Sequence, residues 1–258
     1  MADQPLAGAH VLVTRPRQQS DELVAAIVQA GGDAIRFPVI EIVPRNTSKI
    51  DADVAGLDAP DIVIFVSRNA VAHGLSYSNG AAIAVIGPTT AVAVEAAGKI
   101  VAIRAAQGFD SEHLLAEPAL SDVSGKIIRI IRGNGGREHL ADVLTQRGAT
   151  VQYLPVYTRR IPSYSDDDGQ ELERRWRSHG IDVVTIMSVE SLANLVSVLP
   201  VWCRDRLPET PLVTPATRVL KEALNRFPSC RATLARGPQT GNMIEAIVAA
   251  RQSIPGQA

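Results

Sequence analysis

Hydroxyl side chains recur where apolar runs end and helix-period segments begin. Ser67 and Thr89 stand at such points in the first half of the sequence, and Ser188 and Thr217 do so in the second half. A helix start offers free backbone N–H groups and the positive end of the helix dipole, which together hold carboxylates or phosphates. A single Ser or Thr there is more often an ordinary N-cap than a ligand contact. The repetition in both halves favours a site for an anionic small molecule, lined by helix starts.

The candidate ligand contacts share a position at the carboxyl end of an expected strand or at the start of the helix that follows it. In a parallel sheet this edge is where ligands bind. The residues are Thr14, Arg15, Ser67, Arg68, Asn69, Thr89, Thr90, Gly133, Asn134, Ser188 and Thr217.

Motifs for nucleotides, metals and covalent catalysis are incomplete. In the glycine-rich stretch 132–138, Glu138 stands where a dinucleotide fingerprint needs its third glycine. Gly98-Lys99 and Gly125-Lys126 are each followed by isoleucine, so the hydroxyl that a Walker A loop offers to magnesium is missing. The five histidines occur singly, without the spacing of metal ligands. No G-x-S-x-G or S-x-x-K motif supplies a nucleophile. Any catalysis is therefore expected to be non-covalent and to use no metal and no cofactor.

The elements that must carry these residues alternate along the chain. Short apolar runs typical of buried parallel strands lie at 11–13, 62–66, 84–86, 127–131, 183–187 and 211–213. Amphipathic segments follow them at 20–30, 69–75, 89–97, 138–147, 190–199 and 217–225. This order predicts an α/β fold with mainly parallel sheets flanked by helices. The stretch 44–59 is expected to be a loop.

The two halves of the sequence resemble each other. Gly31 aligns with Gly148 and Arg15 with Arg132, and the same register places 38–39 on 155–156 without a gap. A second alignment places 61–67 on 182–188. Any two strand–helix units look somewhat alike, but these matches follow the same order in both halves of the sequence. This favours an internal duplication. We therefore expect two similar domains with a ligand-binding cleft between them.

Two proline-marked segments, 36–44 and 152–160, interrupt this rhythm. Their β-branched and aromatic residues favour extended structure, while proline limits a strand to an edge or a linker. They are candidate connectors between the domains.

Composition excludes several classes of protein. Among the 258 residues, 26 Lys and Arg balance 27 Asp and Glu, so no general positive field would gather nucleic acid or a membrane surface. The hydrophobic share of 46% predicts a folded globular chain. The first residues lack the regions of a signal peptide, and no apolar stretch approaches the ~20 residues that span a bilayer. The expected location is cytoplasmic, where the two cysteines stay reduced.

Six short stretches spread along the chain form a characteristic set. They are 11–16 (Val-Leu-Val-Thr-Arg-Pro), 37–41 (Phe-Pro-Val-Ile-Glu), 67–71 (Ser-Arg-Asn-Ala-Val), 86–91 (Ile-Gly-Pro-Thr-Thr-Ala), 131–138 (Ile-Arg-Gly-Asn-Gly-Gly-Arg-Glu) and 155–157 (Pro-Val-Tyr). The set resembles the uroporphyrinogen-III synthase family. The stretch 132–138, which stands before an expected helix, resembles a stretch that is characteristic of the family's bacterial members. The second half, at 188–192 and 214–217, matches only in outline.

The resemblance implies two α/β domains joined by a two-stranded connector. Residues 1–37 with 162–258 would form one discontinuous domain, and 42–153 the other. Residues 38–41 and 154–161 would be the connectors. The sequence alone does not separate this arrangement from two consecutive domains.

The resemblance also implies an activity, the cyclisation of hydroxymethylbilane to uroporphyrinogen III with inversion of ring D and loss of water. Such an enzyme is a lyase of tetrapyrrole biosynthesis that needs no cofactor. The implied partners are this substrate and product, with possible transfer from hydroxymethylbilane synthase, and the expected state is a monomer. The alternative is a non-catalytic two-lobed protein that binds an acidic small molecule.

Site residues follow from the same resemblance. Tyr157 stands where the family has a tyrosine on its second connector strand, which makes it the candidate proton donor; the alternative is a packed tyrosine. The hydroxyls of Thr90, Thr217, Ser67 and Ser188 would bind carboxylates. The arginines that would complement the substrate's charge, or else form surface ion pairs, are Arg15, Arg68, Arg132 and Arg137. Ala216 stands where some relatives carry a second threonine, so that contact would be absent or supplied by the backbone here.

Overall fold

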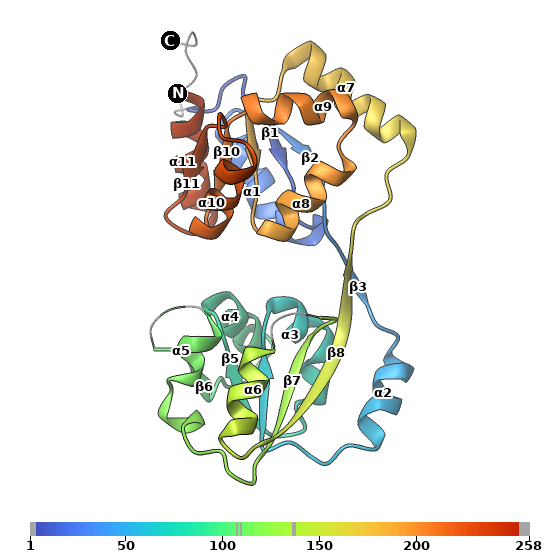
Figure 1. Ribbon diagram of the computed structural model, residues 1–258, viewed down its shortest axis with the longest axis vertical. Helices are drawn as coiled ribbons and strands as arrows, with labels where there is room; N and C mark the ends of the chain where they lie inside the picture. Colours follow the sequence, from blue (N-terminus) through green and yellow to red (C-terminus); the bar gives the residue numbers. More distant parts are fainter. Residues whose placement is uncertain (1–3, 107, 109, 136–137, 253–258) are drawn as a thin grey trace. The chain divides into compact units, whose positions relative to one another are not determined.

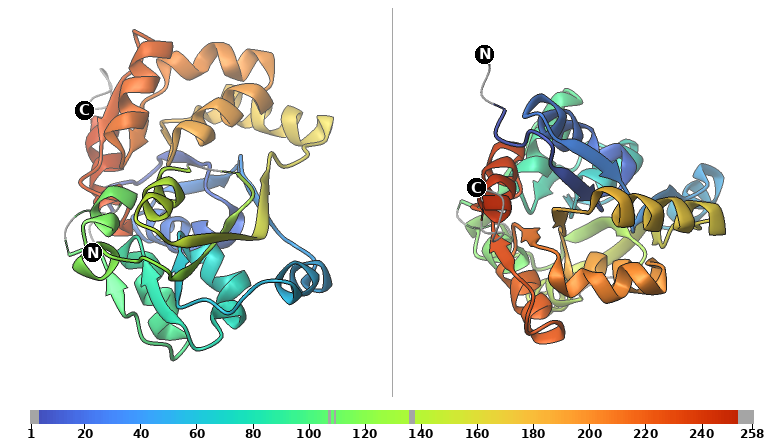
Figure 2. Two further views of the ribbon diagram at one scale, coloured as in Figure 1. Left: turned by 60° about the horizontal axis from the view of Figure 1, so that its bottom comes forward. Right: turned by 90° about the horizontal axis from the view of Figure 1, so that it is seen from above.

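The chain forms two compact α/β units. The computed structural model describes residues 4–106, 108, 110–135 and 138–252. One unit, called here the terminal unit, combines the chain up to Glu41 with the chain from Arg160 on, and the central unit runs from Ile42 to Arg159. Figures 1 and 2 show this combination, because the blue N-terminal strands lie beside the orange and red C-terminal elements.

The terminal unit is built on a parallel five-stranded sheet in the order β11-β10-β9-β1-β2. Its strands are β1 (His10–Val13), β2 (Asp33–Arg36), β9 (Val183–Thr185), β10 (Leu212–Thr214) and β11 (Ala232–Leu234). Its helices are α1 (Arg17–Gln29), α7 (Asp166–His179), α8 (Val189–Val198), α9 (Val201–Arg206), α10 (Thr217–Arg226) and α11 (Thr240–Gln252). Leu23 of α1 and Met243 of α11 join one apolar cluster with Val11 and Val183 of the strands, so both helices cover one face of the sheet.

The central unit contains a six-stranded sheet in the order β3-β8-β7-β4-β5-β6, parallel from β8 to β6. Its strands are β3 (Glu41–Pro44), β4 (Ile62–Phe65), β5 (Ala82–Val85), β6 (Ile103–Arg104), β7 (Ile127–Gly133) and β8 (Thr150–Arg160). Its helices are α2 (Thr47–Ala55), α3 (Arg68–Gly74), α4 (Pro88–Ala96), α5 (Ser111–Leu115) and α6 (His139–Gln146), with 3-10 turns η1 (Leu75–Ser78) and η2 (Pro118–Leu120).

The two sheets share one strand order. When β7 and β8 are equated with β1 and β2, and β4 to β6 with β9 to β11, the neighbours of these five strands correspond, and β3 is the extra strand of the central sheet. The internal alignment predicts three of these equivalences, β1 with β7, β2 with β8 and β4 with β9. The predicted fold class, two similar domains with mainly parallel sheets and a discontinuous first domain, is confirmed.

Two local predictions are wrong. The stretch 44–59, expected to be a loop, contains α2, because Asn46 accepts a hydrogen bond from the Lys49 N–H at 3.4 Å and caps a helix with one buried apolar residue, Ile50. The segment around Pro155 is not confined to an edge, since β8 has β7 on one side and β3 on the other. The register shifts there, and such a bulge accommodates the missing proline N–H.

Among the described residues, no helix is both long and apolar enough to cross a bilayer.

Helix α3 approaches the sheet of the central unit at Gly74. A Cβ atom added there would lie 2.5 Å from Ile131 Cγ2 and 3.1 Å from Val156 Cγ1. We expect Gly74→Ala to lower the free energy of unfolding by about 1–3 kcal/mol, the usual range for overpacking a core. Urea unfolding measures the change. Gly56→Ala is the control, because its Cβ would meet nothing within 4 Å; equal stability of the two variants would contradict the prediction.

Candidate active site

Ser67 begins the site at the carboxyl end of β4. Its extended backbone, with φ −163° and ψ 163°, makes it the N-cap of α3. The Ser67 Oγ accepts a hydrogen bond from the Ala70 N–H at 3.1 Å. The next residues, Arg68 and Asn69, lie half-buried in the first turn of α3. Ser67 is thus the helix cap that its position predicts.

Tyr157 lies beside Ser67. Its side chain has an exposed fraction of 0%, and its hydroxyl oxygen is 3.1 Å from Ser67 Oγ. The ring rests against Gly133, where an added Cβ would come within 2.6 Å of Cε2. The imidazole of His73, at the end of α3, is 6.2 Å away between ring centroids. Three predicted residues, Ser67, Gly133 and Tyr157, therefore meet at one point.

A bulge between β7 and β8 aims Tyr157 at this point. Arg132 is paired with Pro155, but the next residue, Gly133, is paired with Tyr157, so Val156 is the extra residue. Successive residues of a regular strand point to opposite faces. Here Val156 lies against Gly74 and Tyr157 against Ser67, both on the side of α3. The bulge also places the Asn134 N–H 2.9 Å from the Tyr157 carbonyl oxygen, to which it donates.

Arg132 has a packing partner. Its side chain is 8% exposed, and its guanidinium lies 4.6 Å from the centroid of the Tyr153 ring. Burial is the main reason that the pKa of Tyr153 is raised. Arg132 therefore packs on an aromatic face as well as carrying charge near the edge of the sheet.

The start of α4 forms a second part of the same edge. Thr89 is exposed and Thr90 is 3% exposed in its first turn. A cavity of about 160 Å³ lies beside them, between α4 and the ends of β5 and β6. It is lined by Ile86, Gly87, Pro88, Ala91, Val92, Glu95, Arg104 and Ala105.

The remaining predicted contacts that the structure describes belong to the terminal unit. Thr14 is fully buried, and its hydroxyl donates to the Thr185 carbonyl oxygen at 2.6 Å, so it joins β1 to β9. Ser188 caps α8 by accepting from the Ser191 N–H at 3.0 Å. Thr217 is exposed at the start of α10, and Arg15 is half-buried. Arg137 lies outside the described residues.

Sequence comparison identifies the relatives of this chain. A family model described as uroporphyrinogen-III synthase HemD matches residues 21–245. The chain belongs to the uroporphyrinogen-III synthase family. The family suggested by the six short stretches is thereby confirmed.

Individual uroporphyrinogen-III synthases match over most of their length. The one from Escherichia coli K12 is 34% identical over 204 residues, which cover 76% of this chain and 82% of the relative. The one from Synechococcus elongatus is 32% identical over 216 residues, covering 76% and 78%.

Solved structures of uroporphyrinogen-III synthases share the fold at lower identity. A mutant from the extremely thermophilic bacterium Thermus thermophilus has a TM-score of 0.64 at 18% identity and covers 95% of this chain and 100% of that one. The enzyme from Helicobacter pylori has a TM-score of 0.64 at 12% identity and covers 94% and 100%.

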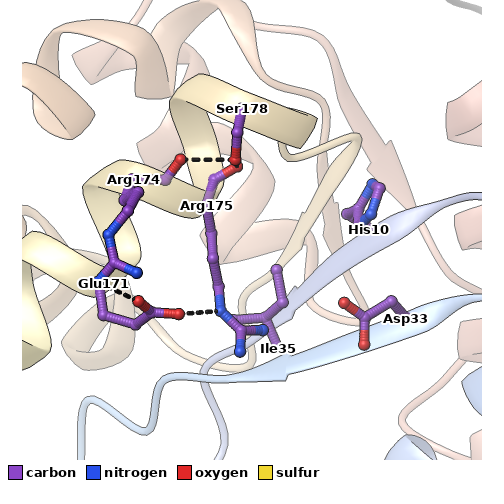
Figure 3. A pocket seen from close by; sticks show the side chains of 7 residues that line it. All are labelled: His10, Asp33, Ile35, Glu171, Arg174, Arg175 and Ser178. Atoms are coloured by element: carbon purple, nitrogen blue, oxygen red, sulfur yellow. Dashed lines mark hydrogen bonds and ion pairs between the residues drawn. The ribbon is translucent and has the colours of Figure 1, made fainter.

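A further pocket of this synthase-family chain lies at the opposite edge of the terminal sheet. His10 and Asp33 are the first residues of β1 and β2, and they line a cavity of about 460 Å³ with Ile35 and residues of α7 (Figure 3). The two arginines of the pocket, Arg174 and Arg175, are both paired with Glu171, and Arg175 holds the pKa of that carboxyl below its usual range. The two arginines are therefore paired within the pocket. None of the residues that line it was predicted for the site.

Sequence reasoning missed the parts that hold Tyr157 in place. His73 belongs to no motif, and its approach to the phenol depends on the short helix α3. Pro155 did carry a signal, because a proline within a strand indicates a bulge as well as an edge. Among the described residues, no group of three or more His, Cys, Asp or Glu is placed to hold a metal ion.

Proposed function

We propose that this chain converts hydroxymethylbilane to uroporphyrinogen III, closing the macrocycle with inversion of ring D and loss of water. The observation that carries this function is membership of the uroporphyrinogen-III synthase family over residues 21–245. The meeting of Ser67, Gly133 and Tyr157 at the carboxyl edge of a parallel sheet supports the proposal, because ligands bind at such edges.

The substrate supplies much of its own reactivity. An electron-rich pyrrole assists loss of the hydroxyl group and gives an azafulvene, which the terminal ring attacks at its substituted carbon. Fragmentation and reclosure of the resulting spiro intermediate invert that ring. The protein must therefore protonate the leaving hydroxyl and hold the chain in one orientation, tasks of positioning and general acid catalysis.

Tyr157 is the proposed source of the proton. A tyrosine hydroxyl can donate a hydrogen bond in the ground state and give up its proton in a transition state. Tyr157 is 0% exposed, so bulk water does not reach its hydroxyl in this structure.

The proposed substrate contacts are the other residues of the two carboxyl edges. Backbone N–H groups and hydroxyls at the starts of α3, α4, α8 and α10 would hold carboxylates, with help from arginines. The set is Thr14, Arg15, Ser67, Arg68, Asn69, Thr89, Thr90, Arg132, Gly133, Asn134, Arg137, Ser188 and Thr217.

The organisation of the chain in solution is part of the same proposal. Residues 1–37 with 162–258 and residues 42–153 would be the domains, joined by 38–41 and 154–161. The boundaries of the compact units, after Glu41 and after Arg159, support this division. We further propose a cytoplasmic monomer that receives its substrate from hydroxymethylbilane synthase and binds neither nucleic acid nor membrane.

The test is the identity of the porphyrin isomer. Hydroxymethylbilane is generated in the presence of the purified chain, the products are oxidised, and the isomers are separated. We expect the type III isomer to dominate. Unassisted closure gives type I, so type I alone, as a protein that merely binds an acidic small molecule would leave it, would refute the function.

A further inference from the structure

The direction of the hydrogen bond between Tyr157 and Ser67 follows from burial. Either oxygen could donate across the 3.1 Å that separates them. The Tyr157 side chain is 0% exposed, and a buried O–H without an acceptor loses the free energy of its bond to water. Ser67 Oγ is the acceptor that the described residues give this phenol. The Tyr157 hydrogen therefore points to Ser67.

The bonds of Ser67 leave one hydrogen unassigned. A serine hydroxyl accepts two hydrogen bonds and donates one. Ser67 Oγ accepts from the Ala70 N–H and from the Tyr157 hydroxyl, so both of its acceptor positions are filled. Its own hydrogen is left to point away from both partners, from a half-buried side chain at the carboxyl end of β4.

The backbone fixes the pair from both sides. The bulge at Val156 turns the Tyr157 ring toward α3, and the missing side chain of Gly133 gives the ring its space. The position of Ser67 Oγ is fixed by its bond to the start of α3. A proton relay, in which one hydroxyl passes its proton through a second hydroxyl, depends on such fixed geometry. Each proton transfer needs a donor and an acceptor that are already aligned.

We propose that Ser67 is the residue that delivers the proton of Tyr157 to the leaving hydroxyl of the substrate. This inference rests on the proposed function. As the carbon–oxygen bond breaks, its electron pair leaves with oxygen, which takes the Ser67 proton and departs as water. Ser67 takes the Tyr157 proton in the same event, which leaves a phenolate. The proton lost when the attacking pyrrole regains its aromaticity returns through Ser67 to the phenolate, so the protein ends unchanged.

The relay predicts a different kinetic effect from carboxylate binding. A hydroxyl that only holds a carboxylate contributes to ground-state binding, so its loss raises KM. A hydroxyl that passes a proton in the transition state contributes to kcat. The two residues of a relay also act as one unit, so their losses do not multiply.

The experiment measures kcat and KM with hydroxymethylbilane for Ser67→Gly, Ser67→Thr, Tyr157→Phe and the double variant Ser67→Gly/Tyr157→Phe. Glycine is tolerated at an N-cap at a cost of only a few tenths of a kcal/mol, and threonine keeps the hydroxyl. Asn46→Gly, which removes the cap of α2 in the same unit, is the matched control.

We expect Ser67→Gly to lower kcat by about 10²-fold, as loss of a general acid does, with KM changed less than about twofold. Ser67→Thr should restore most of the turnover, Asn46→Gly should behave as the unmodified protein, and the double variant should match Tyr157→Phe. Losses that multiply in the double variant, or a Ser67→Gly variant with raised KM and intact kcat, would overturn the relay. Full turnover of Tyr157→Phe would also overturn it, while type III product in the isomer assay would leave the synthase function standing.

Discussion

Replacing Tyr157 by phenylalanine is expected to lower kcat by about 10²–10⁴-fold, the usual contribution of a positioned general acid. The phenyl ring would keep its place against Gly133, so the fold and the binding surface stay intact. KM should therefore change little, because the lost hydroxyl acts in the transition state. Steady-state kinetics with hydroxymethylbilane, measured by type III product, give both constants.

A second tyrosine of the central unit provides the control. Tyr77 in η1 donates to Asp51 Oδ1 at 2.8 Å, and burial with this carboxylate raises its pKa to about 12. Tyr77→Phe removes a phenol hydroxyl that is bonded to Asp51 instead of to Ser67, and it should leave kcat unchanged. If Tyr157→Phe turned over as fast as this control, Tyr157 would be a packing residue.

The fold was predictable from the sequence where strands are continuous apolar runs. Ile62–Phe65 and Ile127–Gly133 are recognisable as buried strands because all or nearly all of their residues face packed layers. The internal alignment predicts two similar domains, and the two sheets do share their strand order. Short or weakly amphipathic elements were not predicted. Strand β6 has only two residues, and α2 buries only Ile50. Their formation depends on neighbours that the local sequence does not reveal.

The site was predictable only in part, because hydroxyls at strand ends have several uses. Thr14 and Ser67 both follow a strand, yet the Thr14 hydroxyl bonds to the backbone of β9 and the Ser67 hydroxyl to a helix start and a phenol. The partner of Thr14 lies 171 positions along the chain. Family resemblance located Tyr157, but its contact with Gly133 depends on a bulge that no periodicity shows. The cleft between the domains stays a prediction.

The two units differ in the second hydroxyl partner of the serine that caps the corresponding helix. Ser188 caps α8 as Ser67 caps α3, but its second partner is Ser191 Oγ at 2.8 Å. The alignment that places 38–39 on 155–156 places Ile40 on Tyr157, and Ile40 is a buried apolar residue. Both units therefore retain a serine-capped helix start, whereas the proposed proton donor, Tyr157, occurs in the central unit at this aligned position.

Arg129 is a buried cation in β7, and its hydrogen bonds lead to the second prediction with a large expected effect. The Arg129 side chain is 0% exposed, and burial lowers its pKa. Its Nε and Nη2 donate to Gln152 Oε1 at 3.1 and 2.9 Å, and Nη2 also donates to the Asp58 carbonyl oxygen at 2.8 Å. Among the described residues, Nη1 has no hydrogen-bond partner. The charge is thus solvated by two uncharged oxygens, and Gln152 supplies the one that comes from a side chain.

Replacing Gln152 by leucine should lower the free energy of unfolding by about 2–3 kcal/mol, because two N–H groups of a buried cation lose their acceptor. Gln152→Glu keeps the shape, adds an opposite charge and should raise the stability at pH 7. Since Arg129 would hold the pKa of the new carboxyl below ~4.3, this gain is present above that pH and disappears as pH falls through the lowered value. Urea unfolding at pH 7 and pH 3, with the exposed Gln146→Leu as control, tests both. Equal stability of the two leucine variants would mean that Gln152 does not solvate the charge.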